Sequence, residues 1–334
     1  MIRVPTALNC LFLKMDFVKN IIGKELDTFE KKFADAVRSQ TPMLDRIMKY
    51  IIKRKGKQMR PMFVFLSAKL NGEINESTYR AAALVELLHT ATLVHDDVVD
   101  ESLERRGFFS INAIWKNKIA VLVGDYLLSK GLLLSTSNED FMHLHILSEA
   151  VKQMSEGELL QIEKSRKLNL DEAIYFEIIR NKTASLLSSA CGVGAYSTSK
   201  DAASTEKMKL FGQKVGIAFQ IKDDLFDYGK EDVGKPTGND IKEKKLTLPL
   251  IYTLNKVDKT ARRKIIFMLK NENKNKESIN FIINAVIEAG GIQYAETKMN
   301  SYRDEALDIL YTFEASPVRA ALEELVRFTT DRKY

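Results

Sequence analysis

Apolar residues recur every three or four positions along most of the chain, the spacing of one face of an α-helix. Between residues 16 and 54 the pattern is broken at Ser39–Pro42, which predicts two amphipathic helices there. The chain has six prolines, none between Pro61 and Pro236, and no Asn-Gly or Asp-Gly hairpin signal between alternating apolar residues. We therefore predict an all-α fold. The same spacing predicts further helices at 62–70, 84–100, 111–135, 140–165, 170–196, 207–227, 316–330 and, in several pieces, between 246 and 315.

The chain of 334 residues shows no shift in composition that would divide it. We expect one domain over residues 16–334, preceded by a leader at 1–15, with Met15 as an alternative start. The leader is too short and too polar at its end for a secretory signal. No run of about twenty apolar residues is present, so we expect no transmembrane segment.

The formal net charge is +6, with basic residues scattered and concentrated only locally, as at Arg262–Lys264. A nucleic-acid-binding protein more often has a basic stripe or a known module, and neither is found. The excess of positive charge is equally consistent with binding of anionic substrates. Cys10 and Cys191 lie far apart and form no Cys-x-x-Cys pair, which favours neither a zinc site nor a disulfide, so a reducing cytoplasm is the expected location.

Two short acidic runs stand out, Asp96–Asp100 and Asp223–Asp227, each with three carboxylates in five residues. Like charges this close raise one another's pKa unless cations hold them. On a helix Asp96 and Asp100 point the same way, while Asp97 is turned by about 100°. Oxygen ligands in pairs suit Mg²⁺, which usually also binds substrate phosphates. We predict two facing carboxylate pairs bridged by Mg²⁺ and a diphosphate. The alternative, a solvated acidic face, is disfavoured by the apolar flanks of both runs.

Basic residues suited to phosphate lie near these runs. In Gly56–Pro61, the ammonium group of Lys57 and the planar guanidinium of Arg60 could bind the same phosphate group. The alternative is that these two residues only provide favourable positive charge at the end of a helix. Two arginines follow the first acidic run in Glu104–Gly107. The glycine-rich, lysine-rich segment Tyr228–Lys245 follows the second run, and it either folds over a bound diphosphate or is a solvated connection.

Taken in order, these blocks closely resemble the trans-isoprenyl diphosphate synthases, or polyprenyl synthetases. The matching residues are the two acidic runs, Gly56–Pro61, Glu86–His89, Arg105–Gly107, Lys182-Thr183 and Phe219-Gln220, and the likeness extends from about residue 45 to the C-terminus. The resemblance implies an isoprenoid-synthase-type helical bundle around a large central cavity. It also implies a homodimer that condenses an allylic diphosphate with isopentenyl diphosphate.

The resemblance further implies roles for individual residues. Mg²⁺, three ions per active site, would be bound by Asp96, Asp100, Asp223 and Asp227. The allylic diphosphate would contact Arg105, Lys182, Lys235 and Lys245, while isopentenyl diphosphate would contact Lys57, Arg60, His89 and Arg106. Thr183 and Gln220 would lie near the carbon that becomes cationic.

Product length is expected to depend on the residues one turn before Asp96, where Ala91 and Thr92 are both small. Short-chain members of the family often have an aromatic residue there. A growing tail would pass this level and stop deeper, at Leu132 or Leu133. We therefore expect a heptaprenyl to decaprenyl product for quinone side chains, of the octaprenyl diphosphate synthase type, with transient contact to a membrane surface during release.

Three alternatives are less consistent with the sequence. A terpene cyclase usually has an Asn/Ser/Glu triad as its second motif, whereas Asp223–Asp227 repeats the aspartates. An inactive partner subunit of a heteromeric synthase would have lost an acidic run or the Lys57/Arg60 pair, and both are present. A helical-repeat scaffold would show self-similarity over tens of residues, which is not seen beyond the two acidic runs.

Overall fold

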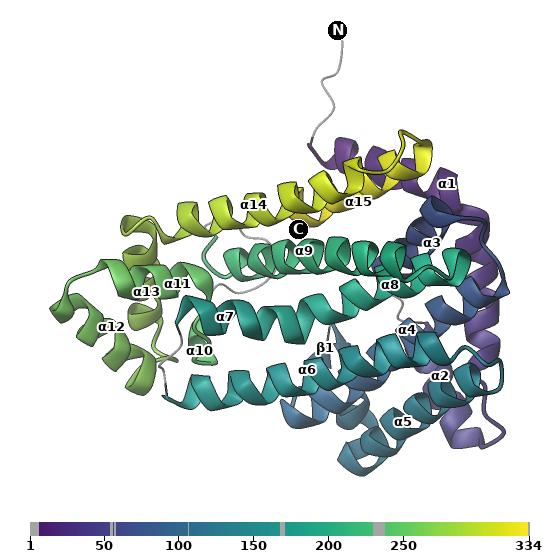
Figure 1. Ribbon diagram of the computed structural model, residues 1–334. Coiled ribbons are helices and arrows are strands. Elements are labelled where there is room, and N and C mark those ends of the chain that lie inside the picture. Colours follow the sequence, from purple (N-terminus) through teal and green to yellow (C-terminus); the bar gives the residue numbers. More distant parts are fainter. Residues whose placement is uncertain are drawn as a thin grey trace, which may run out of the picture.

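The computed structural model describes residues 7–53, 56, 58–105, 107–167, 171–229 and 238–332. Within these ranges the chain is built almost entirely of helices, most of them long and lying side by side (Figure 1). The elements are α1 (Ala7–Ala36), α2 (Pro42–Ile52), α3 (Met59–Asn71), α4 (Glu76–Val99), β1 (Glu104–Arg105), β2 (Phe108–Phe109), α5 (Ile111–Thr136), α6 (Phe141–Lys167), α7 (Glu172–Ile179), the π-helical turn η1 (Arg180–Ala184), α8 (Ser185–Ser199), α9 (Ala202–Phe226), α10 (Asn239–Lys242), α11 (Leu248–Lys256), α12 (Lys259–Asn271), α13 (Lys276–Glu288), α14 (Gly291–Tyr311) and α15 (Pro317–Asp331).

The predicted all-α class is confirmed, with three local differences. Helix α1 begins at Ala7, within the predicted leader, and residues 7–14 contain no proline or glycine that would stop it. The helix expected over 170–196 is interrupted by η1. A two-stranded hairpin, in which Glu104 pairs with Phe109, joins α4 to α5.

Side-chain caps explain where several helices begin. Asn75 accepts a hydrogen bond from the backbone N–H of Thr78, and the Thr78 hydroxyl accepts one from the backbone N–H of Asn75, a reciprocal capping box before α4. Asp171 caps α7, because its carboxylate accepts a hydrogen bond from the backbone N–H of Ile174 at 2.9 Å. Caps of this kind stabilise a helix by about 1 kcal/mol each.

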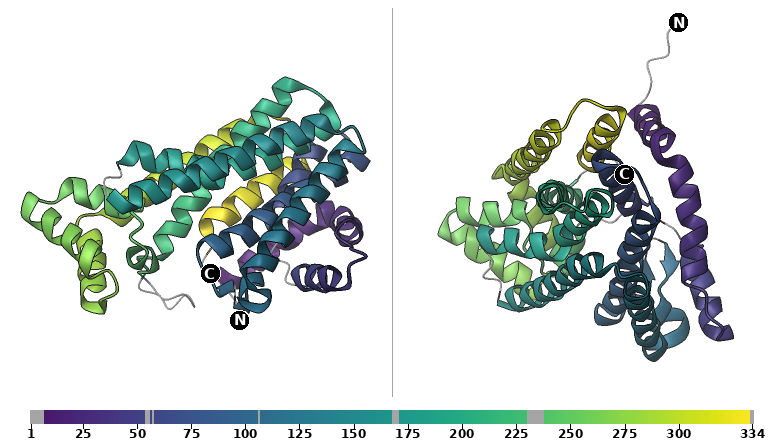
Figure 2. Two further views of the ribbon diagram at one scale, coloured as in Figure 1. Left: turned by 90° about the horizontal axis from the view of Figure 1, so that it is seen from below. Right: turned by 45° about the vertical axis from the view of Figure 1, so that its right-hand side comes forward.

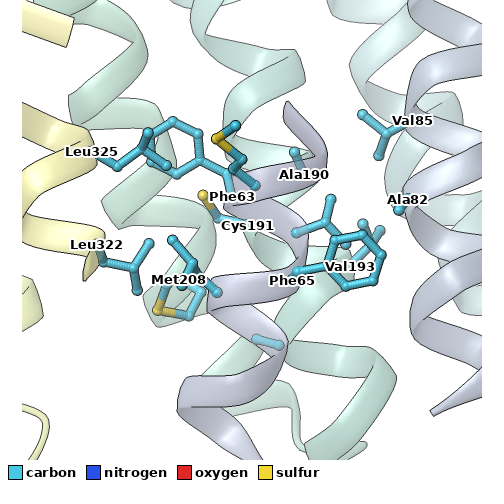
Figure 3. Packing of buried hydrophobic residues seen from close by; sticks show 14 of the residues in the cluster. Phe63, Phe65, Ala82, Val85, Ala190, Cys191, Val193, Met208, Leu322 and Leu325 are labelled. Carbon is cyan, nitrogen blue, oxygen red and sulfur yellow. The ribbon is translucent and has the colours of Figure 1, made fainter. Parts of the chain in front are cut away.

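The largest core lies where α3, α4, α8, α9 and α15 meet (Figure 3). Phe63 and Phe65 of α3 are almost fully buried there, and each contributes roughly 1.5–3 kcal/mol by leaving water. Helix α8 is rich in small residues, and a Cβ added to Gly194 would lie 2.4 Å from the carbonyl oxygen of Val64. Glycine at this position therefore allows α8 to pack directly against α3, which sets the centre of the bundle.

Helix α5 packs along α4, yet it leaves several apolar residues exposed on its outer side. It is long and apolar enough to cross a membrane, contrary to the prediction that no segment is, and 33% of the relevant window is buried. An apolar helix of a packed bundle has the same length and composition, so α5 is weak evidence for a membrane span. The apolar residues on the outer face of α5 are not covered by the described helices of this chain.

Candidate active site

The first acidic run lies at the C-terminal end of α4. Asp96 and Asp100 are one helical turn apart, with the N–H of Asp100 donating to the carbonyl of Asp96 at 2.8 Å. Neither carboxylate accepts a hydrogen bond from the described part of the chain. Burial raises the pKa of Asp96 to about 6, and Glu158 and Asp100 add to the rise while Lys182 opposes it. Neither carboxylate forms a direct ion pair within the described residues, which leaves their oxygens open to a divalent metal ion.

Asp97, in contrast, is a structural residue. Its carboxylate accepts a 2.7 Å hydrogen bond from Nε of Arg105 in β1, and its backbone carbonyl accepts one from the amide of Asn112 at 3.1 Å. Asp97 thereby holds the hairpin against the end of α4. Arg105, predicted to bind diphosphate, also lies close enough to Asp96 to lower its pKa. Arg106 falls outside the described residues.

The second acidic run ends α9, and its three carboxylates have different partners. Asp223 forms an ion pair with Arg332, whose guanidinium lies 4.1 Å from the ring centroid of Phe219. Asp227 accepts the backbone N–H groups of Asn239 and Asp240 at 2.7 and 3.1 Å, at the start of α10. Burial raises the pKa of Asp227, and these two hydrogen bonds oppose the rise.

Asp224 is buried and satisfied on both oxygens. It accepts the phenol of Tyr175 at 2.7 Å and the side-chain amide of Gln220 at 2.8 Å. Burial raises its pKa to about 7, although both hydrogen bonds lower it. The carboxyl of Asp240 is also buried nearby, and burial together with Asp224 and Asp227 raises its pKa to about 8.

Lys182 and Thr183 lie in η1, where the helix widens by one residue per turn. Lys182 forms an ion pair with Glu158 of α6. Thr183 donates to Oε1 of Gln220 at 2.8 Å. A Cβ on Gly157 of α6 would lie 2.9 Å from the backbone nitrogen of Lys182, so glycine is what allows α6 to approach this turn. Thr183, Gln220, Asp224 and Tyr175 thus form one continuous hydrogen-bonded chain.

A cavity of about 210 Å³ opens among α6, α7, η1, α9 and the segment after α10. Its polar lining includes Lys182, Thr183, Gln220, Asp224, Asp240 and Lys245. Burial lowers the pKa of Lys245, but Glu243, Asp240 and Asp100 raise it, and the net shift is upward. Lys245 therefore interacts electrostatically with the first acidic run as well as with the carboxylates near the second. Lys235 falls outside the described residues.

Arg60 and His89 are brought together from α3 and α4. Arg60 donates to Glu86 at 3.1 Å and lies within hydrogen-bonding distance of Nε2 of His89. That both bind one diphosphate stays a prediction, and Lys57 falls outside the described residues. Among the residues that are described, no three His, Cys, Asp or Glu side chains are gathered as a closed metal site. Magnesium typically needs only one or two carboxylates beside substrate phosphates and water.

The four residues predicted to set product length have different surroundings. Leu132 and Leu133 are 48% and 61% exposed on the outer side of α5, because the neighbouring Gly131 is the position that contacts α4. Ala91 is fully buried in the cluster of α2, α4 and α5, away from the cavity. Thr92 is half-buried, and its hydroxyl donates to the carbonyl of His89 at 2.9 Å. None of these four residues lines the cavity, so their role in product length stays a prediction; Thr92 is the half-buried member of the four on α4.

Several residues of the site were not found from the sequence. Tyr175, Glu158 and Arg332 act through partners that are 49, 24 and 109 positions away, respectively. The polar face of α6 that includes Glu158 was visible, but nothing indicated its partner. Asp240 stood in the predicted glycine-rich segment without a separate role. No sequence signal distinguished Tyr175 or Arg332 from other buried or terminal residues.

Comparison with known proteins connects this site to an enzyme family. The family model described as polyprenyl synthetase matches residues 41–286. Heptaprenyl diphosphate synthase component 2 of Bacillus subtilis is 31% identical over 96% of this chain and 92% of its own length. Among solved structures, a polyprenyl synthase from Caulobacter crescentus, complexed with calcium and isoprenyl diphosphate, is 33% identical with a TM-score of 0.88, covering 96% of this chain and 98% of that one. A geranylgeranyl pyrophosphate synthase from Bacteroides thetaiotaomicron is 36% identical with a TM-score of 0.82, covering 96% and 99%.

Proposed function

Because the chain belongs to the polyprenyl synthetase family, we propose that it elongates an allylic diphosphate with successive molecules of isopentenyl diphosphate. The allylic primer is farnesyl or geranylgeranyl diphosphate, and the product is a long-chain all-trans polyprenyl diphosphate. A heptaprenyl to decaprenyl length, suited to quinone side chains, is supported by the small residue Thr92 and by the name of the Bacillus subtilis relative. The geranylgeranyl synthase relative makes a twenty-carbon product the second candidate.

The observation that most supports this function is the pair of lysines at the cavity. Lys182 from η1 interacts with Asp96, and Lys245 from the segment after α10 interacts with Asp100. Both lysines line the same cavity as Asp224 of the second acidic run. Cations and carboxylates from distant parts of the chain therefore converge where a metal-bound diphosphate would fit.

We propose that Asp96 and Asp100 on one side, and Asp223 and Asp227 on the other, hold Mg²⁺, three ions per active site. When bound, Mg²⁺ supplies positive charge to the oxygens of the leaving diphosphate. The carboxylates of Asp96 and Asp100, which accept no hydrogen bond from the described residues, support this ligand set most directly. Asp223 would release Arg332 in order to bind the metal. The calcium in the Caulobacter crescentus structure is compatible with a divalent-metal site in that relative.

The lysines and Arg105 act on the leaving group. As the carbon–oxygen bond of the allylic diphosphate breaks, negative charge grows on the diphosphate and positive charge on the allylic carbon. Side-chain cations already in place stabilise this separation more than they stabilise the bound substrate. We assign this role to Lys182, Lys245 and Arg105, together with Lys235 as the sequence predicts.

Thr183 and Gln220 act on the cation. The amide nitrogen of Gln220 is committed to Asp224, so its oxygen must point toward Thr183 and the cavity. Oriented oxygen atoms place the negative ends of their dipoles beside the electron-poor carbon. The double bond of isopentenyl diphosphate then attacks this carbon, and the departed diphosphate takes the proton that is lost.

Isopentenyl diphosphate would be held by Arg60 and His89, with Lys57 and Arg106 as predicted from the sequence. The Arg60 fork can bind two phosphate oxygens at once. Its present contact with Glu86 keeps the guanidinium oriented at the end of α3. Two separate cationic groups, one for each diphosphate, are what a head-to-tail condensation requires.

We propose that residues 16–334 work as one domain, although the family model ends at residue 286. Helix α15 packs against α1, α3 and α9, and Arg332 just beyond it reaches Asp223. The C-terminal helices therefore contribute to the site rather than standing apart from it. The buried free thiol of Cys191 is compatible with the cytoplasmic location that we propose.

A second copy of this chain is the cover that we propose for the outer face of α5. Leu122, Leu132 and Leu133 expose 63%, 48% and 61% of their surface on this face, which is apolar enough for a stable interface. If the protein is a homodimer, Leu133→Glu should shift the monomer–dimer equilibrium, measured by sedimentation, toward the monomer. If the wild-type protein sediments as a monomer, the relative named component 2 makes a different partner chain the next candidate.

The function is tested by incubating the purified protein with Mg²⁺, labelled isopentenyl diphosphate and farnesyl diphosphate, and sizing the products. We expect products of about 35 to 50 carbons, which correspond to about seven to ten isoprene units. A chelator should abolish their formation, and added Mg²⁺ should restore it. Accumulation of a twenty-carbon product would support the second candidate. No incorporation with either primer would refute both.

A further inference from the structure

Basic charge is concentrated in one segment that the active site does not use. Residues 256–276 contain eight lysines and arginines and two acids, Asp258 and Glu272. The chain has 51 basic and 45 acidic residues, so the remainder has 43 of each. The whole net charge of +6 therefore resides in this segment, which we call the basic lobe. Its cations are Lys256, Lys259, Arg262, Arg263, Lys264, Lys270, Lys274 and Lys276.

All eight cations of the basic lobe are exposed. None of them forms an ion pair within the described parts of the chain, although Lys264 lies 4.1 Å from the ring centroid of Phe281. Elsewhere on the surface many lysines and arginines are paired with acids on neighbouring turns, as Lys49 is with Asp45. An unneutralised cluster repels itself, and it favours an anionic partner.

Helix α12 carries five of these charges, and three of the five lie on one side. At about 100° per residue, Lys259, Arg263 and Lys270 fall within roughly 40° of one another, and Phe267 lies next to them. Phe267 is 56% exposed, while Ile265 and Leu269 on the opposite side are buried. A large apolar side chain among cations on an otherwise anchored helix is typical of a helix that lies at a membrane interface.

The basic lobe is joined to the wall of the active site. Helices α12 and α13 project beyond the long helices at one end of the molecule (Figures 1 and 2). Nζ of Lys244 donates to the carbonyl of Lys270 at 2.8 Å, and the amide of Asn273 donates to the carbonyl of Lys242 at 2.5 Å. The segment held in this way also contains Asp240 and Lys245, which line the cavity.

We propose that the basic lobe docks on an anionic lipid bilayer, with the cations of α12 at the headgroups and Phe267 in the interface. The cluster would suit nucleic-acid phosphates electrostatically, but an exposed phenylalanine favours the bilayer. The choice also rests on the proposed function, because a polyprenyl product has a long hydrocarbon tail that water does not solvate. A protein docked next to its active site would release that tail into the membrane.

The test is cosedimentation with vesicles of phosphatidylcholine, either alone or with roughly one-third phosphatidylglycerol. We expect binding only to the anionic vesicles, weakened when the salt is raised from about 0.05 M to about 0.5 M. The triple variant Lys259→Gln/Arg262→Gln/Arg263→Gln should reduce the partition coefficient on the order of 100-fold. Phe267→Ser should reduce it roughly 10-fold.

A matched control removes three exposed lysines of α1, as Lys19→Gln/Lys24→Gln/Lys31→Gln, which changes the net charge equally. If the position of the cations matters rather than the total charge, the partition coefficient of this control on anionic vesicles should stay within about twofold of the wild-type value. Equal loss in the control, equal binding to neutral vesicles, or binding of an RNA or DNA duplex in place of anionic vesicles would each overturn the proposal. Elongation assayed without vesicles is unchanged in all three variants, which separates this test from that of the proposed function.

Discussion

The phenol of Tyr175 donates a 2.7 Å hydrogen bond to Asp224, a carboxylate at the centre of the second acidic run. Both groups are buried, and the other oxygen of Asp224 holds Gln220. Tyr175 is therefore positioned to orient, through Asp224, the Gln220 and Thr183 oxygens that face the cavity. It touches no reacting atom, so it is a positioning residue.

We expect Tyr175→Phe to lower kcat about 10-fold with little change in KM, because the oxygen dipoles beside the cation lose their fixed direction. The lost hydrogen bond should also reduce the free energy of unfolding by about 1–2 kcal/mol. Tyr228→Phe is a matched control, since this buried phenol is hydrogen-bonded to Thr247 at 2.6 Å. Steady-state kinetics and denaturant unfolding of both variants provide the comparison. A kcat loss that is equal in the control would assign Tyr175 a role in stability only.

Asp96→Ala should abolish turnover, with a loss of at least about 100-fold in kcat, because it removes a proposed metal ligand at the leaving group. Glu156→Gln, which removes an exposed carboxylate from α6, should retain full activity. Labelled isopentenyl diphosphate incorporation at saturating Mg²⁺ measures both. Near-normal activity of Asp96→Ala would remove this residue from the metal site.

Thr92→Phe should shorten the product while condensation continues, because the ring would occupy the side of α4 that leads from Asp96 into the bundle. The equivalent change at Ala91 has a different expected outcome. Ala91 is fully buried against α2 and α5, so Ala91→Phe should overpack this core and destabilise the protein by about 1–3 kcal/mol. Mass spectrometry of the products and thermal unfolding of both variants separate the two effects. An unchanged product length in Thr92→Phe would exclude it as a determinant.

Stability in acid should depend on His143, which is 1% exposed. Burial lowers its pKa from 6.5 to about 4; Lys200 and Arg80 add to the lowering, and Asp140 opposes it. The unfolded chain takes up a proton below pH 6.5 that the folded chain resists until about pH 4. The contribution of His143 to the free energy of unfolding is therefore complete above pH 6.5, and it is lost as the pH falls from 6.5 to about 4. The loss is about 3 kcal/mol at most.

The check is the free energy of unfolding as a function of pH for wild type, His143→Gln and His145→Gln. His145 is two positions away but exposed, so its replacement should leave the wild-type profile unchanged. His143→Gln should be less stable at neutral pH and should lose less on acidification. Equal losses of stability in wild type and His143→Gln between pH 6.5 and pH 4 would contradict the assignment.

The sequence by itself determined the fold class and the chemistry of the site. A period of three to four residues depends only on local geometry, so most helices were predicted to within a few positions; the exceptions are the starts of α1, α4 and α9 and the turn η1. The acidic runs were recognisable because three carboxylates in five residues are uncommon between apolar flanks, whereas Lys182-Thr183 was recognisable only through the family resemblance. The hairpin after α4 was missed, since its strands have two residues each.

Only the tertiary structure decided which partner each side chain has and which way it faces. Asp223, Asp224 and Asp227 look alike in the sequence, yet one pairs with Arg332, one with Tyr175 and one with the start of α10. Those partners come from helices distant along the chain, and their contacts depend on packing that no local pattern encodes. For the same reason the sequence could not show that Ala91 is buried against α2 and α5 or that Leu132 is exposed: helical spacing orders the faces of one helix, but which face is inside depends on the neighbours that cover it.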